Sequence, residues 1–168
     1  MKINTLGPVT EDAQKSTMEF LLINHPLDCP VCDQAGECEL QDISLDHGDY
    51  KSSYKEIKRT VVDKDIGKLV TTEMTRCIHC SRCVRFGEEV AGIKELGMTG
   101  RGEETKIETF VNQSLTSELS GNVIDLCPVG ALNNNLYKYS ARTWDLKQIS
   151  SISSNDCLGS NIYYHIYK

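Results

Sequence analysis

The pattern of apolar and polar positions predicts a helix near the start of the chain. Thr10 is a capping residue followed by two acidic residues, and apolar side chains then recur at helical spacing as far as Leu22. The helix should stop at Pro26, because proline cannot continue one. We therefore expect the helix to deliver His25 to the segment that comes next.

The helical periodicity disappears between Leu27 and Cys38. This segment contains Pro30 and Gly36 among three cysteines, and neither a helical nor a strand pattern fits it. We expect an irregular loop, and something other than regular secondary structure must hold its conformation. A short helical pattern resumes over residues 39–46.

The next elements are a charged connection, a helix and a hairpin. Residues 51–68 form the connection, with Val61 and Val62 as its expected core contact. A helical pattern follows Cys83 and ends near Gly92. Three turn glycines then lead into an alternating stretch, which indicates a β-hairpin. That stretch consists of Ile107, Thr109 and Val111.

The last third of the chain shows a helical pattern and then a strand. Residues 114–126 mix the helical pattern with Gly121, and Pro128 ends it. The tail closes with strand-forming residues at 162–167, which resemble part of a larger sheet.

Composition narrows the classes of function. Of 168 residues only 39% are apolar and three are Phe, so something besides apolar burial must help to hold the fold. A net charge of −6 argues against a nucleic-acid surface, which needs a basic stripe. No stretch approaches the roughly 20 apolar residues of a membrane span. The first residues lack a signal-peptide core and an Arg-rich transit pattern, so we expect a soluble chain that matures where it is made.

Four of the eight cysteines form an evenly stepped set. Cys77, Cys80 and Cys83 lie three residues apart, and Cys127 precedes Pro128. A Cys-x2-Cys-x2-Cys loop with a distant Cys-Pro can wrap around one four-iron cluster, because thiolates are the preferred ligands of such clusters. A zinc site, which usually has two separated pairs of ligands, is the alternative.

A second set of soft ligands lies within fourteen residues and consists of His25, Cys29, Cys32 and Cys38. Spacing alone leaves zinc and iron–sulfur evenly balanced here, because zinc knuckles also use three cysteines and one histidine. The evenly stepped set, Cys77, Cys80, Cys83 and Cys127, which we call the Cys77 set, favours a four-iron cluster at this site too. We call the set described here the His25 set. Imidazole in place of a thiolate would remove one negative charge from that cluster.

Several other residues near these sets have no necessary role. His47 and His79 are not needed, because both ligand sets are complete without them. Cys157 has no companion and is expected to be a buried thiol. Three arginines are candidates for offsetting cluster charge, although arginines in such places are more often solvated or paired. They are Arg76, Arg82 and Arg85.

Four strings of residues occur in the order of a known family. They are MEFLLINHPLDCPVCDQAGECELQD at 18–42, MTRCIHCSRCVRF at 74–86, LGMTGRG at 96–102 and SELSGNVIDLCPVGAL at 117–132. They closely resemble the large iron–sulfur subunit of respiratory NADH:ubiquinone oxidoreductase, complex I, known as the 75 kDa or G subunit.

The resemblance implies two four-iron clusters, one held by His25, Cys29, Cys32 and Cys38 and the other by Cys77, Cys80, Cys83 and Cys127. Both would be one-electron carriers in the peripheral arm, on the route from NADH and flavin to ubiquinone. The chain would then be a subunit of a proton-translocating NADH:ubiquinone reductase with no substrate chemistry of its own. Its partners would be other complex I subunits, including the flavin-bearing one, with no nucleic acid and no direct membrane span.

The resemblance also has two departures. We expect the N-terminal 2Fe-2S domain and the C-terminal molybdopterin-oxidoreductase-like domain of the family to be supplied by other chains. Such a short form suits an organelle-encoded fragment on the matrix side of the mitochondrial inner membrane. The alternative location is the cytoplasmic face of a bacterial plasma membrane.

These observations predict an α+β chain of two small cluster-binding lobes with short helices, a β-hairpin and long ligand loops. Residues 1–50 would hold the His25 set, 51–139 would form a ferredoxin-like lobe with the Cys77 set, and 140–168 would begin a truncated or split C-terminal domain. Two rivals remain: a zinc-stabilised structural or interaction module, and the iron–sulfur subunit of a related hydrogenase or formate dehydrogenase.

Overall fold

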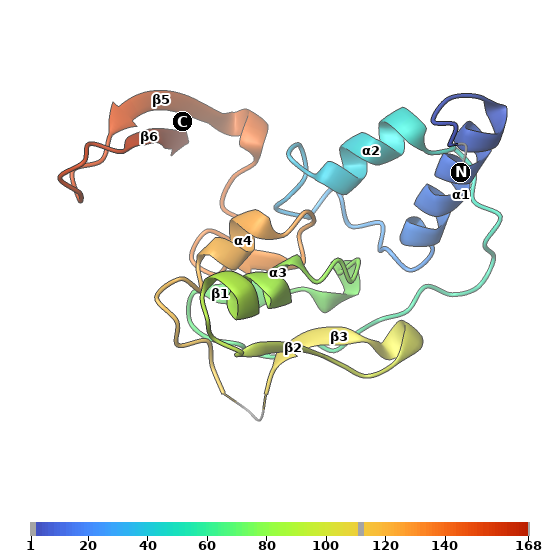
Figure 1. Ribbon diagram of the computed structural model, residues 1–168. Helices are drawn as coiled ribbons and strands as arrows, with labels where there is room; N and C mark the ends of the chain where they lie inside the picture. The colour runs from blue at the N-terminus through green and yellow to red at the C-terminus, as the bar shows by residue number, and fades with distance from the viewer. Residues whose placement is uncertain (1–2, 111–112, 168) are drawn as a thin grey trace.

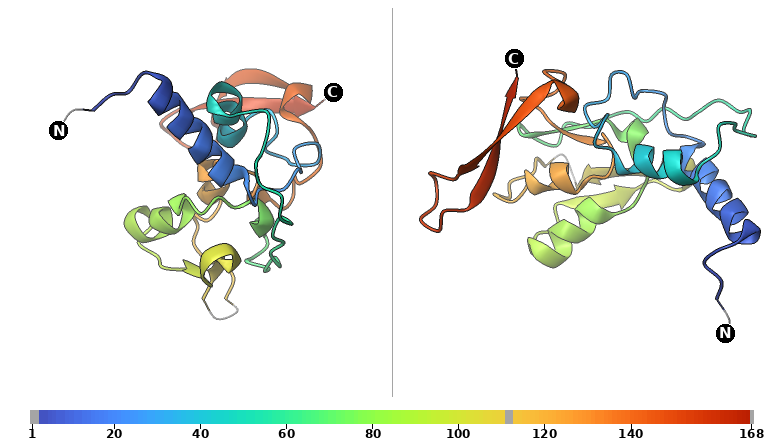
Figure 2. Two further views of the ribbon diagram at one scale, coloured as in Figure 1. Left: turned by 90° about the vertical axis from the view of Figure 1, so that its right-hand side faces the viewer. Right: turned by 90° about the horizontal axis from the view of Figure 1, so that it is seen from above.

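The computed structural model describes residues 3–110 and 113–167. Short helices and two-stranded sheets are joined by long irregular segments. The N-terminal helix and the C-terminal hairpin lie at opposite ends of the molecule (Figure 1), and Figure 2 shows each projecting from the central part. This arrangement confirms the predicted α+β class.

The first helix, α1 (Pro8–Leu22), begins before its expected cap. Pro8 takes the first turn, where its missing N–H removes no helical hydrogen bond. The expectation that Thr10 caps the helix is therefore wrong. Thr10 lies inside the first turn, where its hydroxyl donates to the carbonyl of Asn4 at 3.4 Å. The helix ends at Leu22, before the stop that we expected at Pro26, and the backbone N–H of His25 donates to the Leu22 carbonyl at 3.2 Å.

The short helix expected after Cys38 is present as α2 (Glu39–His47). It contacts α1, and Met18 of α1 and Leu40 of α2 are both buried. The charged connection that follows has no helix or strand before residue 70. Val61 packs against the core as expected, whereas Val62 is 81% exposed, so its prediction as a core contact is wrong.

The central part of the fold surrounds the Cys77 set. Strand β1 (Val70–Thr72) pairs antiparallel with β4 (Leu132–Asn134), and the single turn η1 (Met74–Arg76) follows β1. Helix α4 (Asn122–Leu126) occupies only the end of the stretch where a helical pattern was expected. The largest fully buried side chains of the described residues are Ile66, Val70, Met74, Val129 and Leu132.

The helix expected after Cys83 is split into two forms. Helix α3 (Arg82–Arg85) passes directly into the π-helical turn η2 (Phe86–Val90), closed by a hydrogen bond of 2.9 Å from Ala91 N–H to the Phe86 carbonyl. Gly92 ends the segment with φ of 69°, as its position predicts.

The predicted hairpin is confirmed as β2 (Leu96–Thr99) and β3 (Lys106–Thr109), which pair antiparallel and are joined through η3 (Gly102–Glu104). Val111, which we expected to continue it, lies outside the described residues. Gly97 leaves room for the ring of Phe110, which would have to shift for an added Cβ at 2.5 Å.

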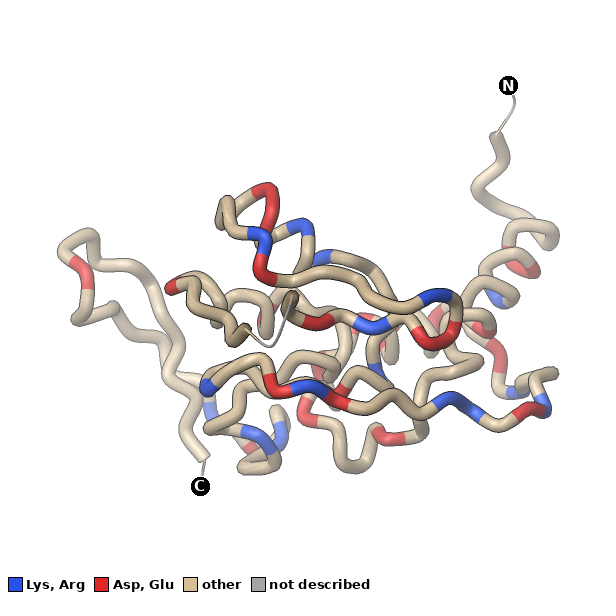
Figure 3. The backbone as a smooth tube through the Cα atoms, turned by 90° about the horizontal axis from the view of Figure 1, so that it is seen from below, with Lys and Arg blue, Asp and Glu red and all other residues tan. Residues whose placement is uncertain are grey.

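The tail forms a second hairpin after the single turn η4 (Thr143–Asp145). The expected terminal strand is β6 (Asn161–Tyr167), and it pairs antiparallel with β5 (Leu146–Ile152). The pattern missed β5 because its apolar residues, 146, 149 and 152, are three apart and do not alternate. Figure 3 shows acidic and basic residues interleaved along the backbone, with few of either on this hairpin.

Candidate metal centres

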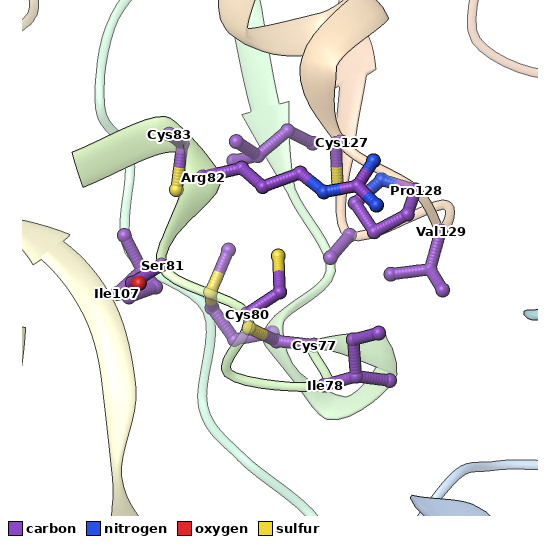
Figure 4. Close-up of a pocket in the computed structure, with 13 residues that line it drawn as sticks. Cys77, Ile78, Cys80, Ser81, Arg82, Cys83, Ile107, Cys127, Pro128 and Val129 are labelled. Atoms are coloured by element: carbon purple, nitrogen blue, oxygen red, sulfur yellow. The ribbon is translucent and has the colours of Figure 1, made fainter. Parts of the chain in front are cut away.

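Four cysteines line one cavity in the centre of the fold. Cys77, Cys80, Cys83 and Cys127 surround about 350 Å³ of space, part of it open to solvent. Figure 4 shows their sulfur atoms facing that space. The remaining wall is mostly apolar and includes Met74, Ile78, Ile107, Val129 and Leu132.

Local structure explains how these thiols reach the cavity. Cys77 ends η1, Cys83 lies in α3 and Cys127 directly follows α4. Between the first three, His79 and Ser81 have φ of 55° and 58°, a conformation that side-chain-bearing residues rarely adopt. These two left-handed residues wind the loop tightly, and the N–H of His79 donates to the Cys77 sulfur at 3.4 Å.

The chemistry of these thiols fits an iron–sulfur cluster. Burial raises the pKa of the Cys83 thiol to about 12. Burial also raises the pKa of Cys77 and of Cys127, and backbone N–H groups of neighbouring residues partly offset it. Such thiols keep their protons at neutral pH until a cation replaces them. Four sulfur donors around one mostly apolar cavity, two of them buried and only Cys80 exposed, therefore suit iron, which binds thiolate.

The other candidate ligands lie around the loop between α1 and α2. Cys38 directly precedes α2, and burial raises its pKa, with Cys32 and Cys29 near enough to raise it further. His25 follows α1, and its Nδ1 atom is buried without a hydrogen-bond partner among the described residues. Burial, with Lys58 and Arg76 nearby, lowers the pKa of His25 to about 4. A neutral imidazole with an unsatisfied nitrogen suits a metal ligand.

Across residues 3–110 and 113–167, no three or more His, Cys, Asp and Glu side chains form a group that could hold a single metal ion. The four thiols of the Cys77 set are distributed around their cavity wall.

The loop between α1 and α2, which we call the His25 loop, is held by contacts from the C-terminal part of the chain that no sequence pattern indicated. The Arg142 guanidinium donates to the carbonyls of Pro30 and Cys32, and the Thr143 hydroxyl donates to the carbonyl of Ala35 at 3.2 Å. Gly36 leaves room for this contact, because an added Cβ would lie 2.5 Å from Thr143 Oγ1. More than 100 residues separate these partners, so no local pattern reveals them.

The histidines and the cysteine that belong to neither ligand set are exposed or bonded to the backbone. His47 is exposed in the last turn of α2, and His79 Nε2 lies 2.7 Å from the carbonyl oxygen of Thr105. The expectation that Cys157 is buried is wrong, because it lies exposed in the turn between β5 and β6. No helix in the described part of the chain is long and apolar enough to cross a membrane.

Comparison with known families matches both cysteine-rich segments. Residues 14–52 match the NADH-ubiquinone oxidoreductase-G iron-sulfur binding region. Residues 67–133 match the ferredoxin-like domain of NADH-quinone oxidoreductase subunit 3. All eight residues of the two ligand sets of the sequence analysis fall within these two segments.

Curated relatives extend the match over 96% of the chain. The similarity is 56% identity to the NADH-ubiquinone oxidoreductase 75 kDa subunit of Reclinomonas americana and 57% to the mitochondrial iron-sulfur protein 1 of NADH dehydrogenase of Solanum tuberosum. It is 51% to the G subunit of NADH-quinone oxidoreductase of Rickettsia felis. Only 22% to 24% of each relative is covered, so the chain spans less than a quarter of their length.

The fold also occurs among solved structures. A chain in the crystal structure of the H2-reduced NAD+-reducing [NiFe]-hydrogenase superposes with a TM-score of 0.71 over 81% of this chain and 59% of that one, at 22% identity.

Proposed function

Because the chain belongs to the family of the 75 kDa and G subunits of NADH–quinone oxidoreductase, we propose that it carries electrons through two four-iron clusters in the peripheral arm of respiratory complex I. The electrons would come from NADH through flavin and continue towards ubiquinone. The observation that carries this proposal is the ring of four thiols around one apolar cavity in the ferredoxin-like segment.

The ligands that we assign follow from the donor sets. Cys77, Cys80, Cys83 and Cys127 would hold one cluster, since they line a common cavity. The other cluster would be held by His25, Cys29, Cys32 and Cys38. When bound, each cluster supplies one-electron storage and release.

The protein's own part in this function is to hold and orient the clusters and to shield them from water. Apolar side chains such as Met74, Ile107 and Leu132 keep water from the buried thiols. Backbone N–H groups such as that of His79 stabilise negative charge on sulfur. This role needs no acid–base chemistry from a side chain, so the chain would contribute to the reductase by transferring electrons.

The proposal includes the setting of the chain. Residues 1–50 and 51–139 would form the two cluster-binding lobes, and 140–168 would begin the C-terminal part. The partners would be the flavin-bearing subunit and the chains that carry the 2Fe-2S and C-terminal domains of the family. Relatives occur in mitochondria and in bacteria. The location that we propose is the matrix side of the mitochondrial inner membrane, and the alternative is the cytoplasmic face of a bacterial plasma membrane.

The test is to measure iron, acid-labile sulfide and zinc in the anaerobically purified complex and to follow its reduction by low-temperature electron paramagnetic resonance. About eight iron atoms on this chain, with two four-iron signals, are expected. Zinc at both sites with no reducible signal would instead establish a structural module.

Single-ligand variants then assign the sites. Cys127→Ser should remove one signal and keep the other, because Cys127 belongs to one cavity alone. The matched control is Cys157→Ser, which changes an exposed cysteine outside both ligand sets and should keep both signals.

A further inference from the structure

Two ion pairs connect the two ligand sets. Arg76, next to Cys77, donates from Nε to the Asp28 carboxylate at 3.1 Å, and Asp28 is next to Cys29. Arg82, beside Cys83, makes two hydrogen bonds of 2.9 and 2.8 Å to Glu39, which follows Cys38. Each pair therefore joins a neighbour of one ligand set to a neighbour of the other.

The two pairs differ in burial. The Arg76 side chain is 4% exposed, whereas the Arg82 side chain is 46% exposed. Arg85, the third arginine of this region, is 66% exposed and pairs with Glu89 one helical turn away. Solvent and salt screen exposed charges strongly and buried charges much less. Of the three arginines, Arg76 is therefore the one whose charge reaches its surroundings with the least screening.

Arg76 also contacts the backbone where the two sets meet. Its Nη1 donates to the Gly130 carbonyl at 3.4 Å. A Cβ added to Gly130 would lie 2.3 Å from the Cys32 sulfur and 3.7 Å from Arg76 Nη1. The missing side chain of Gly130 thus leaves the space that a sulfur of the His25 set occupies, beside the guanidinium that adjoins the Cys77 set.

We propose that Arg76 is a positioning residue shared by both clusters, whose buried charge raises the reduction potential of each and whose hydrogen bonds fix the His25 loop against the loop that follows Cys127. This inference rests on the proposed function, because it requires a reducible cluster at each site.

The physical reason is the charge change on reduction. Each cluster gains one electron and therefore one negative charge. A positive charge held nearby in a medium of low dielectric constant stabilises the reduced form more than the oxidised form. Asp28, which is 40% exposed on its side chain, offsets this effect only in part because solvent screens it.

The decisive experiment compares Arg76→Gln with the matched control Arg85→Gln in the whole complex, by redox titration followed with electron paramagnetic resonance. Arg76→Gln should shift the midpoints of both four-iron signals to lower potential, and Arg85→Gln should shift neither. Unchanged midpoints in Arg76→Gln would overturn the inference while leaving two working clusters. Absence of any reducible signal in the wild-type complex would overturn the proposed function and this inference together.

Two further variants separate charge from structure. Arg76→Lys keeps the charge but not the planar fork, and it should restore both midpoints towards the wild-type values. Asp28→Asn removes the counter-charge and should raise the midpoint of the His25 cluster, a shift of opposite sign that loss of structure alone does not produce. If Arg76→Gln loses its clusters, the Asp28→Asn result decides, because an unchanged or lowered midpoint would overturn the inference.

Discussion

The sulfur of Cys38 lies 3.6 Å from the carbonyl oxygen of Pro128, although the two residues are 90 positions apart. Pro128 follows Cys127, so the end of the second ligand set packs against the last cysteine of the first. Substitutions in the loop after Cys127 should therefore change the geometry of both ligand sets.

Gly130→Ala tests this contact directly. Its new Cβ would lie 2.3 Å from the Cys32 sulfur, and a ligating sulfur cannot rotate away. We expect a loss of about 1–3 kcal/mol in the free energy of unfolding, as for other overpacked sites, and a changed signal from the His25 cluster. Circular dichroism during anaerobic urea unfolding measures the first, and electron paramagnetic resonance measures the second.

The control for that variant is Gly121→Ala. No atom lies within 4 Å of its added Cβ, and Gly121 has helical φ and ψ, so stability should change little. Equal losses in the two variants would show that the contact with Cys32 is not the cause.

Arg142→Ala should loosen the His25 loop selectively. The guanidinium donates to two carbonyls of that loop, and hydrogen bonds to charged groups contribute about 1.5–3 kcal/mol each. During incubation with an iron chelator, the signal of the His25 cluster should decay faster than in the wild type while the other decays at the wild-type rate. Lys147→Ala, an exposed change in β5, is the control. Joint acceleration of both signals would contradict a local role.

Glu95 should contribute a pH-dependent part of the stability. Hydrogen bonds from the Thr116 hydroxyl and from the backbone N–H groups of Thr116 and Ser117 lower its pKa below the ordinary value of 4.5. Because the folded pKa is the lower one, this stabilisation is complete above pH 4.5 and is lost as the pH falls through the folded value.

Glu95→Gln should therefore be less stable than the wild type at neutral pH, and the difference should narrow as the pH falls below 4.5. Urea unfolding at a series of pH values measures this difference. Glu118→Gln, an exposed neighbour of the same segment, is the comparison. A difference that stays constant with pH would contradict the role of these hydrogen bonds.

Removal of iron should unfold the centre of the chain. The core is small, and Cys83 and Cys127 are among its buried members, so bound metal replaces apolar contacts that a larger core would supply. Hydrogen exchange should become fast in residues 70–83 and 122–134 after chelation. Protection that persists there without iron would show that the fold is independent of its clusters.

The sequence predicted features that depend on local spacing. Helix α2 and the β2–β3 hairpin follow from periodicity and turn residues. The predicted start of α1 was wrong because two residues indicate different starts. Thr10 is a typical capping residue, but Pro8 occupies the first turn, so the helix begins before Thr10. Cys157 was expected to be buried because cysteines often are, but a hairpin turn exposes it.

Contacts between distant segments could not be predicted. The spacing of cysteines limits which side chains share a site, but it does not reveal that Arg142 supports a loop 110 residues earlier. It also does not distinguish buried Arg76 from exposed Arg85, since burial depends on how β4 and the loop before it fold over the chain.

The C-terminal hairpin has a practical consequence for handling the chain. Strands β5 and β6 form a two-stranded sheet of their own within the described residues, so each has an outer edge where further strands can add. Its faces carry exposed Ile152, Tyr163 and Ile166. Separated from its complex and concentrated, the chain is expected to self-associate through these edges, so dilute solutions should have the longer shelf life.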